Sequence, residues 1–150
     1  MRAVIQRVSE ASVVVEDEKV ANIQQGVLVF LGIEFEDSKE DAGWLANKIS
    51  ALRIFSDSEG KMNNSLLDID GDVIVVSQFT LHAKTKKGNR PSYIKSARPE
   101  QAIPLYEQFK NELSIVVGKQ VQSGEFGADM KVSLLNDGPV TIIIDSKNKE

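Results

Sequence analysis

The sequence contains no cysteine and only one histidine, His82. Without cysteine there is no disulfide framework, no thiolate metal site and no cysteine nucleophile. A lone histidine also excludes a zinc site built from several histidines. No apolar run approaches the roughly 18 residues that a membrane-spanning helix needs, and no apolar leader precedes the first Val and Ile residues. We therefore expect a cytoplasmic protein with no metal site and no cofactor, which does not bind a membrane.

An excess of positive charge is also missing. The formal net charge of -4 argues against a protein that binds long nucleic acid through a broadly basic surface. It does not exclude a local basic patch. The hydrophobic share of 41% and the charged share of 27% are ordinary for a globular protein. A chain of 150 residues suits one domain, residues 1–150, whose core buries roughly two-thirds of the unfolded surface.

Hydrophobic spacing predicts several strands and two helices. Ser38 is a good N-cap for the first helix, and Pro99 suits the first position of the second. Residues after Asp145 are expected to form a frayed tail. The predicted strands cover residues 1–8, 11–15, 19–23, 27–33, 72–81, 130–135 and 140–144, and the second helix ends at about residue 117.

The stretch Asn136-Asp137-Gly138-Pro139-Val140-Thr141 lies between the last two predicted strands. Asn, Asp and Gly favour turns, and an X–Pro bond is the one place where a cis peptide costs little. One interpretation is an ordinary hairpin turn. The other is a sharp bend that presents two bare carbonyl oxygens with no side chain in the way.

The stretch Ser77-Gln78-Phe79-Thr80-Leu81 ends the predicted strand 72–81. On a strand, Ser77 and Phe79 would share one face, while Gln78, Thr80 and His82 would share the other. Polar residues at the end of a buried strand suit a binding site, but Ser77 and Thr80 could equally satisfy backbone groups. A serine–histidine pair is a poor fit, since Ser77 would face away from His82, which we expect to be a loop residue.

Two groups of positive charge stand out. Arg7 falls inside an apolar strand, where it either snorkels at a solvated edge or aims its fork of donors at backbone carbonyls. The second group is the basic segment, Lys84 to Arg98, which carries six positive charges and no acid. This segment is either a solvated loop or a compact phosphate-binding patch suited to one end of an RNA.

Together, the stretches 77–81 and 136–141 resemble the two signature motifs of the D-aminoacyl-tRNA deacylases, also called D-tyrosyl-tRNA(Tyr) deacylases. The opening Ile5-Gln6-Arg7-Val8, the stretch 53–63 and Arg90-Pro91-Ser92 fit the same family. The resemblance therefore extends over essentially the whole chain, and the two motifs at this spacing make it specific.

The resemblance implies an α+β fold, a single domain in which mixed and antiparallel β-sheets form a barrel-like core with two main helices. It also implies a homodimer with active sites at the subunit interface. The Gly138–Pro139 peptide would be cis, and its carbonyls would enter the partner's site. There an L side chain would collide with them, whereas a D-amino acid or glycine would fit. Arg7 would hold this motif in orientation.

The implied reaction is hydrolysis of the ester bond of D-aminoacyl-tRNA, and of glycyl-tRNA mischarged on tRNA(Ala), which releases the amino acid and the tRNA. The catalysis would be RNA-assisted, with the terminal ribose hydroxyl taking part, which agrees with the lack of a convincing base. The implied catalytic residues are Ser77, Gln78, Phe79 and Thr80, largely through backbone groups, and the implied substrate-binding residues are Met130, Asn136 and Arg90.

Three other interpretations stay open. One is a DNA- or RNA-binding, replication-associated protein of the same fold, a role attached to some animal relatives of the family. Another is a hydrolase that uses Thr80 or Ser77 as a covalent nucleophile. The third is a structural dimer without catalysis.

Overall fold

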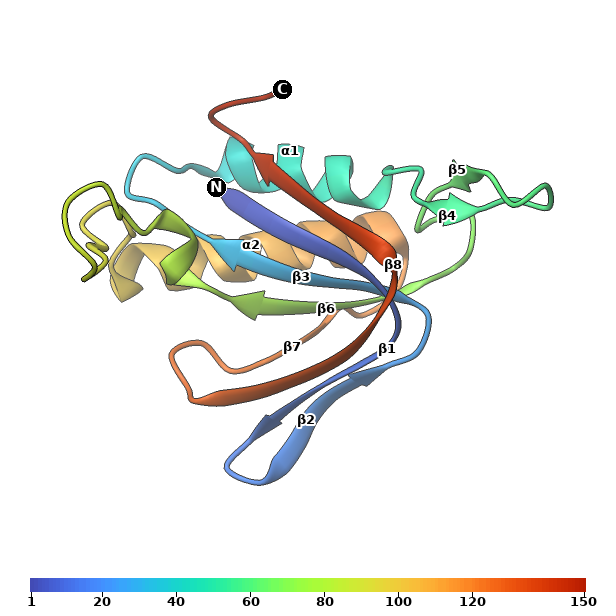
Figure 1. Cartoon of the computed structure of the whole chain (residues 1–150), viewed down its shortest axis with the longest axis horizontal. Helices are drawn as coiled ribbons and strands as arrows, with labels where there is room; N and C mark the ends of the chain where they lie inside the picture. The colour runs from blue at the N-terminus through green and yellow to red at the C-terminus, as the bar shows by residue number, and fades with distance from the viewer.

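The protein folds around one six-stranded sheet, with a separate two-stranded sheet and two long helices (Figure 1). The computed structural model describes all residues, 1–150. No helix combines the length and apolar character needed to cross a membrane. The elements are β1 (Arg2–Val15), β2 (Glu18–Ile23), β3 (Gly26–Gly32), α1 (Lys39–Ser50), β4 (Phe55–Ser56), β5 (Met62–Asn64), β6 (Asp72–Ser77), the 3-10 turn η1 (Phe79–His82), α2 (Pro99–Val117), β7 (Gln122–Ser123) and β8 (Met130–Asp145).

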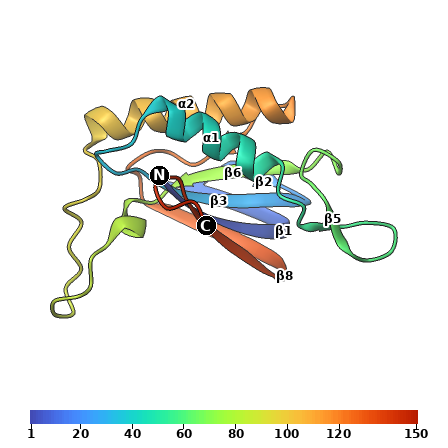
Figure 2. The same cartoon turned by 90° about the horizontal axis from the view of Figure 1, so that it is seen from above.

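Strand β1 organises the main sheet. It pairs antiparallel with β3 through Arg2–Val8 and with β2 through Ala11–Val15, and β8 pairs antiparallel along its other edge. β6 continues the sheet parallel to β3, and the short β7 lies parallel to β6. Both long helices cover the same face of the sheet (Figure 2). The expected α+β class, mixed sheet and two main helices are confirmed.

The curl of the sheet creates two apolar cores, one on each face of β3. Val29 and Leu31 point into the larger core, between the sheet and the helices, whereas Leu28 points into the smaller one. This alternation follows from the two-residue period of a strand. Val132 and Leu134 of β8 close the smaller core from the far side, which gives the sheet its nearly closed, barrel-like form.

The prediction of a strand over 72–81 is wrong in its last four residues. β6 ends at Ser77, and the chain turns into η1. Its partner β3 ends at Gly32, and the Gln78 amide makes one further bond, to the Leu31 carbonyl at 2.8 Å. Beyond that point β3 offers no ladder partner, so the chain folds back over Gly32. The face alternation expected for Phe79, Thr80 and His82 therefore does not apply.

The two strands expected around the Gly138–Pro139 turn are one long strand, β8, and the hairpin interpretation is wrong. Both halves pair with β1: Asn136 lies opposite Val8, and Thr141 lies opposite Gln6. The residues between Asn136 and Thr141 thus face Arg7 alone and form a bulge. We call residues 137–140 the β8 bulge.

The expected frayed tail is wrong for the first residues after Asp145. Ser146 is buried, and its amide donates a 2.8 Å hydrogen bond to the Met1 carbonyl. The next side chain, Lys147, donates to the Asp41 carboxylate at 2.8 Å. These contacts fasten the residues after β8 to the N-terminus and to the start of α1.

Candidate active site

An apolar pocket of about 280 Å³ lies where β6 ends. Three consecutive residues of the signature stretch, Ser77, Gln78 and Phe79, line it, and Met130 of β8 lines it too. Ten of its thirteen lining residues are hydrophobic, so a ligand here meets apolar walls and only a few polar groups. The other lining residues are Leu31, Ile33, Val76, Ala97, Ala102, Phe126, Gly127, Ala128 and Val132.

The 3-10 turn η1 sets the polar edge of this pocket. The first N–H groups of a helix have no acceptor inside the helix. The backbone amides of Phe79 and Thr80, the first two residues of η1, therefore have no partner within the turn. Gln78 Nε2 lies 2.5 Å from Thr80 Oγ1 and donates to it. Thr80 is half-buried as a residue, and Gln78 orients its hydroxyl, although Thr80 does not itself line the pocket.

His82 is the last residue of η1 and its side chain is buried, so its assignment to a polar loop is wrong. Its exposed fraction is only 4%, and its Nε2 has no hydrogen-bond partner. The imidazole packs against Gly32: a Cβ added there would stand 3.0 Å from both the His82 ring and the Gln78 carbonyl. The single histidine thus packs the end of η1 against β3.

The β8 bulge is fixed by two side chains. Arg7 Nε donates to the Asp137 carbonyl at 2.7 Å, and Arg7 Nη1 donates to the Ile54 carbonyl at 2.5 Å. Asn136 Nδ2 donates to the carbonyls of Arg7 and Val140 at 2.9 and 3.1 Å. Of the two interpretations of Arg7, the fork of donors aimed at backbone carbonyls is confirmed. The Arg7 side chain is only 12% exposed, so it does not snorkel at a solvated edge.

Two exposed residues, Gly138 and Pro139, form the tip of the bulge, and the peptide bond between them is cis. A Cβ at position 138 would collide with the Val140 backbone nitrogen, so the bend needs glycine here. Residues 137–139 are all exposed. The bulge therefore presents backbone groups to the outside of the subunit.

The two signature stretches do not meet within one chain. Arg7, opposite the bulge, pairs with Val27 at the start of β3, whereas Ser77 pairs with Leu31 near its end. Four residues of strand separate these positions by roughly 13 Å. None of Gly138, Pro139, Arg7 and Asn136 lines the pocket.

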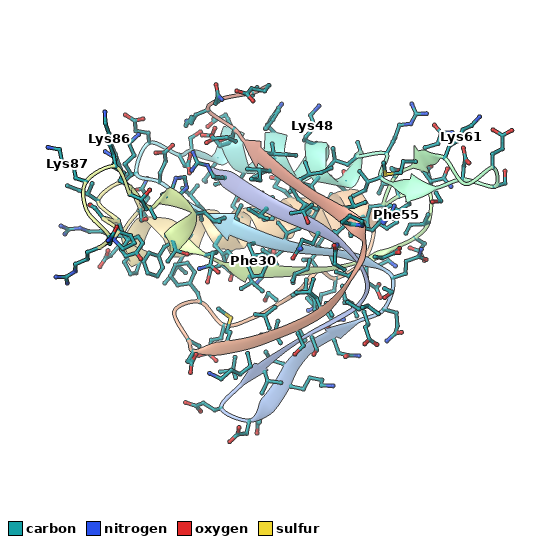
Figure 3. The ribbon with its side chains drawn as sticks, viewed as in Figure 1. Phe30, Lys48, Phe55, Lys61, Lys86 and Lys87 are labelled. Atoms are coloured by element: carbon teal, nitrogen blue, oxygen red, sulfur yellow. The ribbon has the colours of Figure 1, made fainter.

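The basic segment forms an exposed loop between η1 and α2. Lys84 and Ser92 exchange backbone hydrogen bonds of 2.8 and 3.0 Å, which close the loop at its base. All six of its cations are exposed and none makes a salt bridge. Figure 3 shows Lys86 and Lys87 extending away from the body of the protein. Arg90 belongs to this loop and not to the pocket wall.

Sequence reasoning missed the support behind the pocket. The ring of Phe126, a wall residue, makes an edge contact with the Tyr106 ring at 5.7 Å between centroids. The Tyr106 hydroxyl donates to the Val75 carbonyl at 2.9 Å, and burial raises the pKa of this phenol. A lone aromatic in the connector after α2 is the only sequence signal that could have pointed to Phe126.

The family model described as D-Tyr-tRNA(Tyr) deacylase matches residues 4–145. The chain belongs to this family. Its relatives named D-aminoacyl-tRNA deacylase include proteins from Flavobacterium johnsoniae and Bacteroides fragilis, each 63% identical over the full length of both chains. A relative from Christiangramia forsetii is 64% identical over 99% of both chains.

Solved structures show that the likeness to the deacylase family includes the fold. A structure titled c-Myc DNA Unwinding Element Binding Protein is 39% identical, with a TM-score of 0.92 over 97% of this chain and 98% of the other. A structure titled as a probable eukaryotic D-amino acid tRNA deacylase has a TM-score of 0.81 at 18% identity, over 95% and 97% of the two chains. The second likeness concerns the fold alone.

Proposed function

We propose that the protein hydrolyses the ester bond of D-aminoacyl-tRNA and releases the free D-amino acid and the tRNA. The observation that carries this proposal is the pocket at the end of β6, lined by Ser77, Gln78 and Phe79 in a chain of the deacylase family. The names of its relatives, at about 60% identity and over the full length, support the same reaction. Such a substrate places the protein in the cytoplasm, with the translation machinery.

An aminoacyl ester is already activated, so the site needs to position a water and stabilise the developing oxyanion more than it needs a strong nucleophile. The amides of Phe79 and Thr80 are the donors we assign to that oxyanion. The Gln78 side chain, which lines the pocket and donates to the Thr80 hydroxyl, is the polar side chain we assign to orient the water or the ester. No histidine or cysteine side chain is available as a base, which supports a role for the terminal ribose hydroxyl of the RNA.

The chiral filter requires a second copy of the chain. The β8 bulge is exposed, and it lies away from the pocket of its own subunit. In the proposed homodimer, Gly138 and Pro139 of each subunit enter the pocket of the other and present their carbonyl oxygens to the Cα of the aminoacyl group. An L side chain collides with these oxygens, whereas a D side chain or the hydrogen of glycine does not. Glycyl-tRNA mischarged on tRNA(Ala) is therefore a substrate as well.

The RNA end is held beside the pocket. Met130 lines the pocket and offers an apolar surface to the terminal adenosine. Arg90 and the other cations of the basic loop contact phosphates close to that end. Asn136 contributes through the shape of the bulge, because its amide donates to two backbone carbonyls there.

The deciding measurement is deacylation of D-tyrosyl-tRNA and of L-tyrosyl-tRNA by the purified protein, with spontaneous ester decay as the blank. We expect fast loss of the D-ester while the L-ester decays at the blank rate. Equal, slow loss of both esters would contradict the proposal. Thr80→Ala and Ser77→Ala extend the test: if both variants keep their activity, neither hydroxyl is a covalent nucleophile.

A binding function is the second candidate, because a structure titled as a DNA unwinding element binding protein is 39% identical. The net charge of -4 disfavours DNA binding through an extended basic surface, and the basic loop is small. Titration of the protein with labelled single-stranded and duplex DNA at several salt concentrations separates the two candidates. Tight DNA binding without deacylation would favour this one.

A further inference from the structure

A pair of aromatic rings lies at the edge of the pocket, beside the basic loop. Phe79 is 54% exposed and Tyr93 is 39% exposed, and their ring centroids are 5.0 Å apart at an interplanar angle of 73°. Ser96 Oγ donates to the Phe79 carbonyl at 3.0 Å and ties the loop to η1. The backbone of Phe79 serves the proposed oxyanion, so its ring has no assigned role.

The charge around this pair is uncompensated. Tyr93 belongs to the basic loop, whose six cations make no salt bridge. Exposed aromatic faces next to free cations are the combination that binds unpaired nucleic acid, because bases stack on the rings while phosphates meet the positive charges. An apolar protein partner would gain nothing from the cations.

We propose that the Phe79–Tyr93 pair is a stacking site for one unpaired nucleobase, the base next to the terminal adenosine of the bound RNA. This inference rests on the proposed function, since it names how the same site holds its substrate. At about 280 Å³ the pocket lies at the lower end of the range for ligand sites, so it has no room for a further nucleotide besides the aminoacyl group and the terminal nucleoside. The next base must lie outside, where Phe79 already lines the rim.

Binding can be tested without catalysis. The probe is a short RNA that ends in the tRNA 3′ sequence and carries 2-aminopurine next to the terminal adenosine. Stacking on an aromatic ring quenches this fluorophore, so we expect quenching when the wild-type protein binds. Tyr93→Phe keeps the ring and should keep the quenching, whereas Tyr93→Ala should lose it and weaken binding on the order of tenfold.

The matched control is Ile94→Ala. Ile94 is the next residue along the chain and is 76% exposed, but it has no aromatic ring. We expect this variant to bind the probe as the wild type does. If Ile94→Ala and Tyr93→Ala weaken binding equally, or if Tyr93→Ala changes the oligomeric state without changing the quenching, the stacking site is wrong and the surface is a general apolar contact.

Kinetics separate this inference from the deacylation itself. D-tyrosyl-tRNA contains the stacked base, whereas D-tyrosyl-adenosine lacks it. We expect Tyr93→Ala to raise KM about tenfold for the tRNA ester and to leave hydrolysis of the adenosine ester unchanged. Equal slowing of both esters would overturn the stacking site. If the wild type hydrolyses neither ester, the proposed function fails, while the quenching of the RNA probe still decides whether the base stacks.

Discussion

At the scale of single residues, the β8 bulge depends on one side chain. Arg7 reaches from β1 to the carbonyls of Asp137 and Ile54, so it connects the bulge to the segment that follows α1. A guanidinium can serve both carbonyls at once because its donors form a rigid fork. An ammonium group of lysine carries its charge on a single nitrogen and cannot span the two.

We therefore predict that Arg7→Lys lowers the discrimination between D- and L-tyrosyl-tRNA about tenfold or more. The lost hydrogen bond to a charged donor corresponds to about 1.5–3 kcal/mol. Rates of D- and L-ester hydrolysis measure the effect. Arg53→Lys is the control, since exposed Arg53 makes a single bond, to the Asn63 carbonyl. An unchanged D/L ratio in Arg7→Lys would show that the bulge keeps its shape without the fork.

Single residues also differ in how far the neighbouring sequence predicts their place in the structure. Arg7 could be singled out because a charge in an apolar strand needs an explanation, and one of its two interpretations is confirmed. The burial of His82 could not be predicted in this way, because it depends on how the chain folds after the end of β6. Nothing in its neighbours indicates that η1 turns back onto Gly32.

At the scale of elements, the junction between β6 and η1 depends on Gly32. An added Cβ would lie 3.0 Å from the Gln78 carbonyl oxygen, a backbone atom that cannot move away without shifting the turn. We predict that Gly32→Ala destabilises the protein by about 1–3 kcal/mol and slows deacylation, as overpacking does elsewhere. Urea unfolding and the D-ester assay measure the two effects.

The control for this prediction is Gly43→Ala in α1, where nothing lies within 4 Å of an added Cβ. Alanine favours a helix over glycine by about 0.5–1 kcal/mol, so this variant should be slightly more stable than the wild type and equally active. Wild-type activity in Gly32→Ala would show that the position of η1 does not matter for the reaction.

The sequence pattern predicts the bounds of the helices but not those of every strand. Helix α1 begins after its capping residue Ser38, and α2 runs over the predicted residues, because caps and periodicity are local signals. The end of β6 and the continuity of β8 are not local: the first is set by the length of β3, the second by pairing with β1 on both sides of the bulge. Hydrophobic runs alone predict strands but not their partners.

The junction of α1 with the chain end gives a pH-dependent prediction. Burial alone would raise the pKa of Asp41, but hydrogen bonds from Lys147, Ser146 and Ser38 outweigh it and hold that pKa well below its ordinary value of 3.8. A depressed carboxyl pKa stabilises the fold above the ordinary value, and the contribution disappears as the pH falls below it. Lys147→Met should therefore destabilise at pH 7 by about 1 kcal/mol or less, and by less at pH 3.

Urea midpoints at the two pH values test this prediction. Lys131→Met is the matched control, because its partner Asp129 is exposed and the pair lies on the surface. We expect no measurable change for that variant at either pH. If Lys147→Met loses as much stability at pH 3 as at pH 7, the contact with Asp41 does not depend on charge.

At the scale of the whole molecule, one subunit separates the two signature stretches. The pocket lies at the end of β3, whereas the bulge lies at its beginning and points outward. The sequence pattern predicts both stretches but not this distance, because it carries no register between β1, β3 and β8. The remaining pocket walls, such as Phe126 and Ala128, come from a connector whose residues show no motif.

This separation makes the dimer testable by complementation. Gln78→Ala removes a pocket residue, and Gly138→Val adds a side chain that would collide with the Val140 backbone nitrogen and distort the bulge. In the proposed homodimer each variant alone is inactive, because every site combines a pocket with the partner's bulge: Gln78→Ala damages the pocket itself, and the side chain that Gly138→Val adds blocks the partner's pocket. A mixed dimer holds one site with both parts intact. Random exchange of equal amounts should therefore restore about a quarter of the wild-type sites.

The measurement is D-tyrosyl-tRNA hydrolysis after the two variants are mixed, unfolded and refolded together, compared with each variant treated alone. Activity that returns only on co-refolding requires that the pocket of one chain works with the bulge of another. A control mixture of Gln78→Ala and Ala97→Trp, both altered in the pocket wall, should stay inactive, since no arrangement of two chains rebuilds an intact pocket. If the first mixture also stays inactive while size-exclusion chromatography shows mixed dimers, each subunit acts alone and the chiral filter lies elsewhere in the chain.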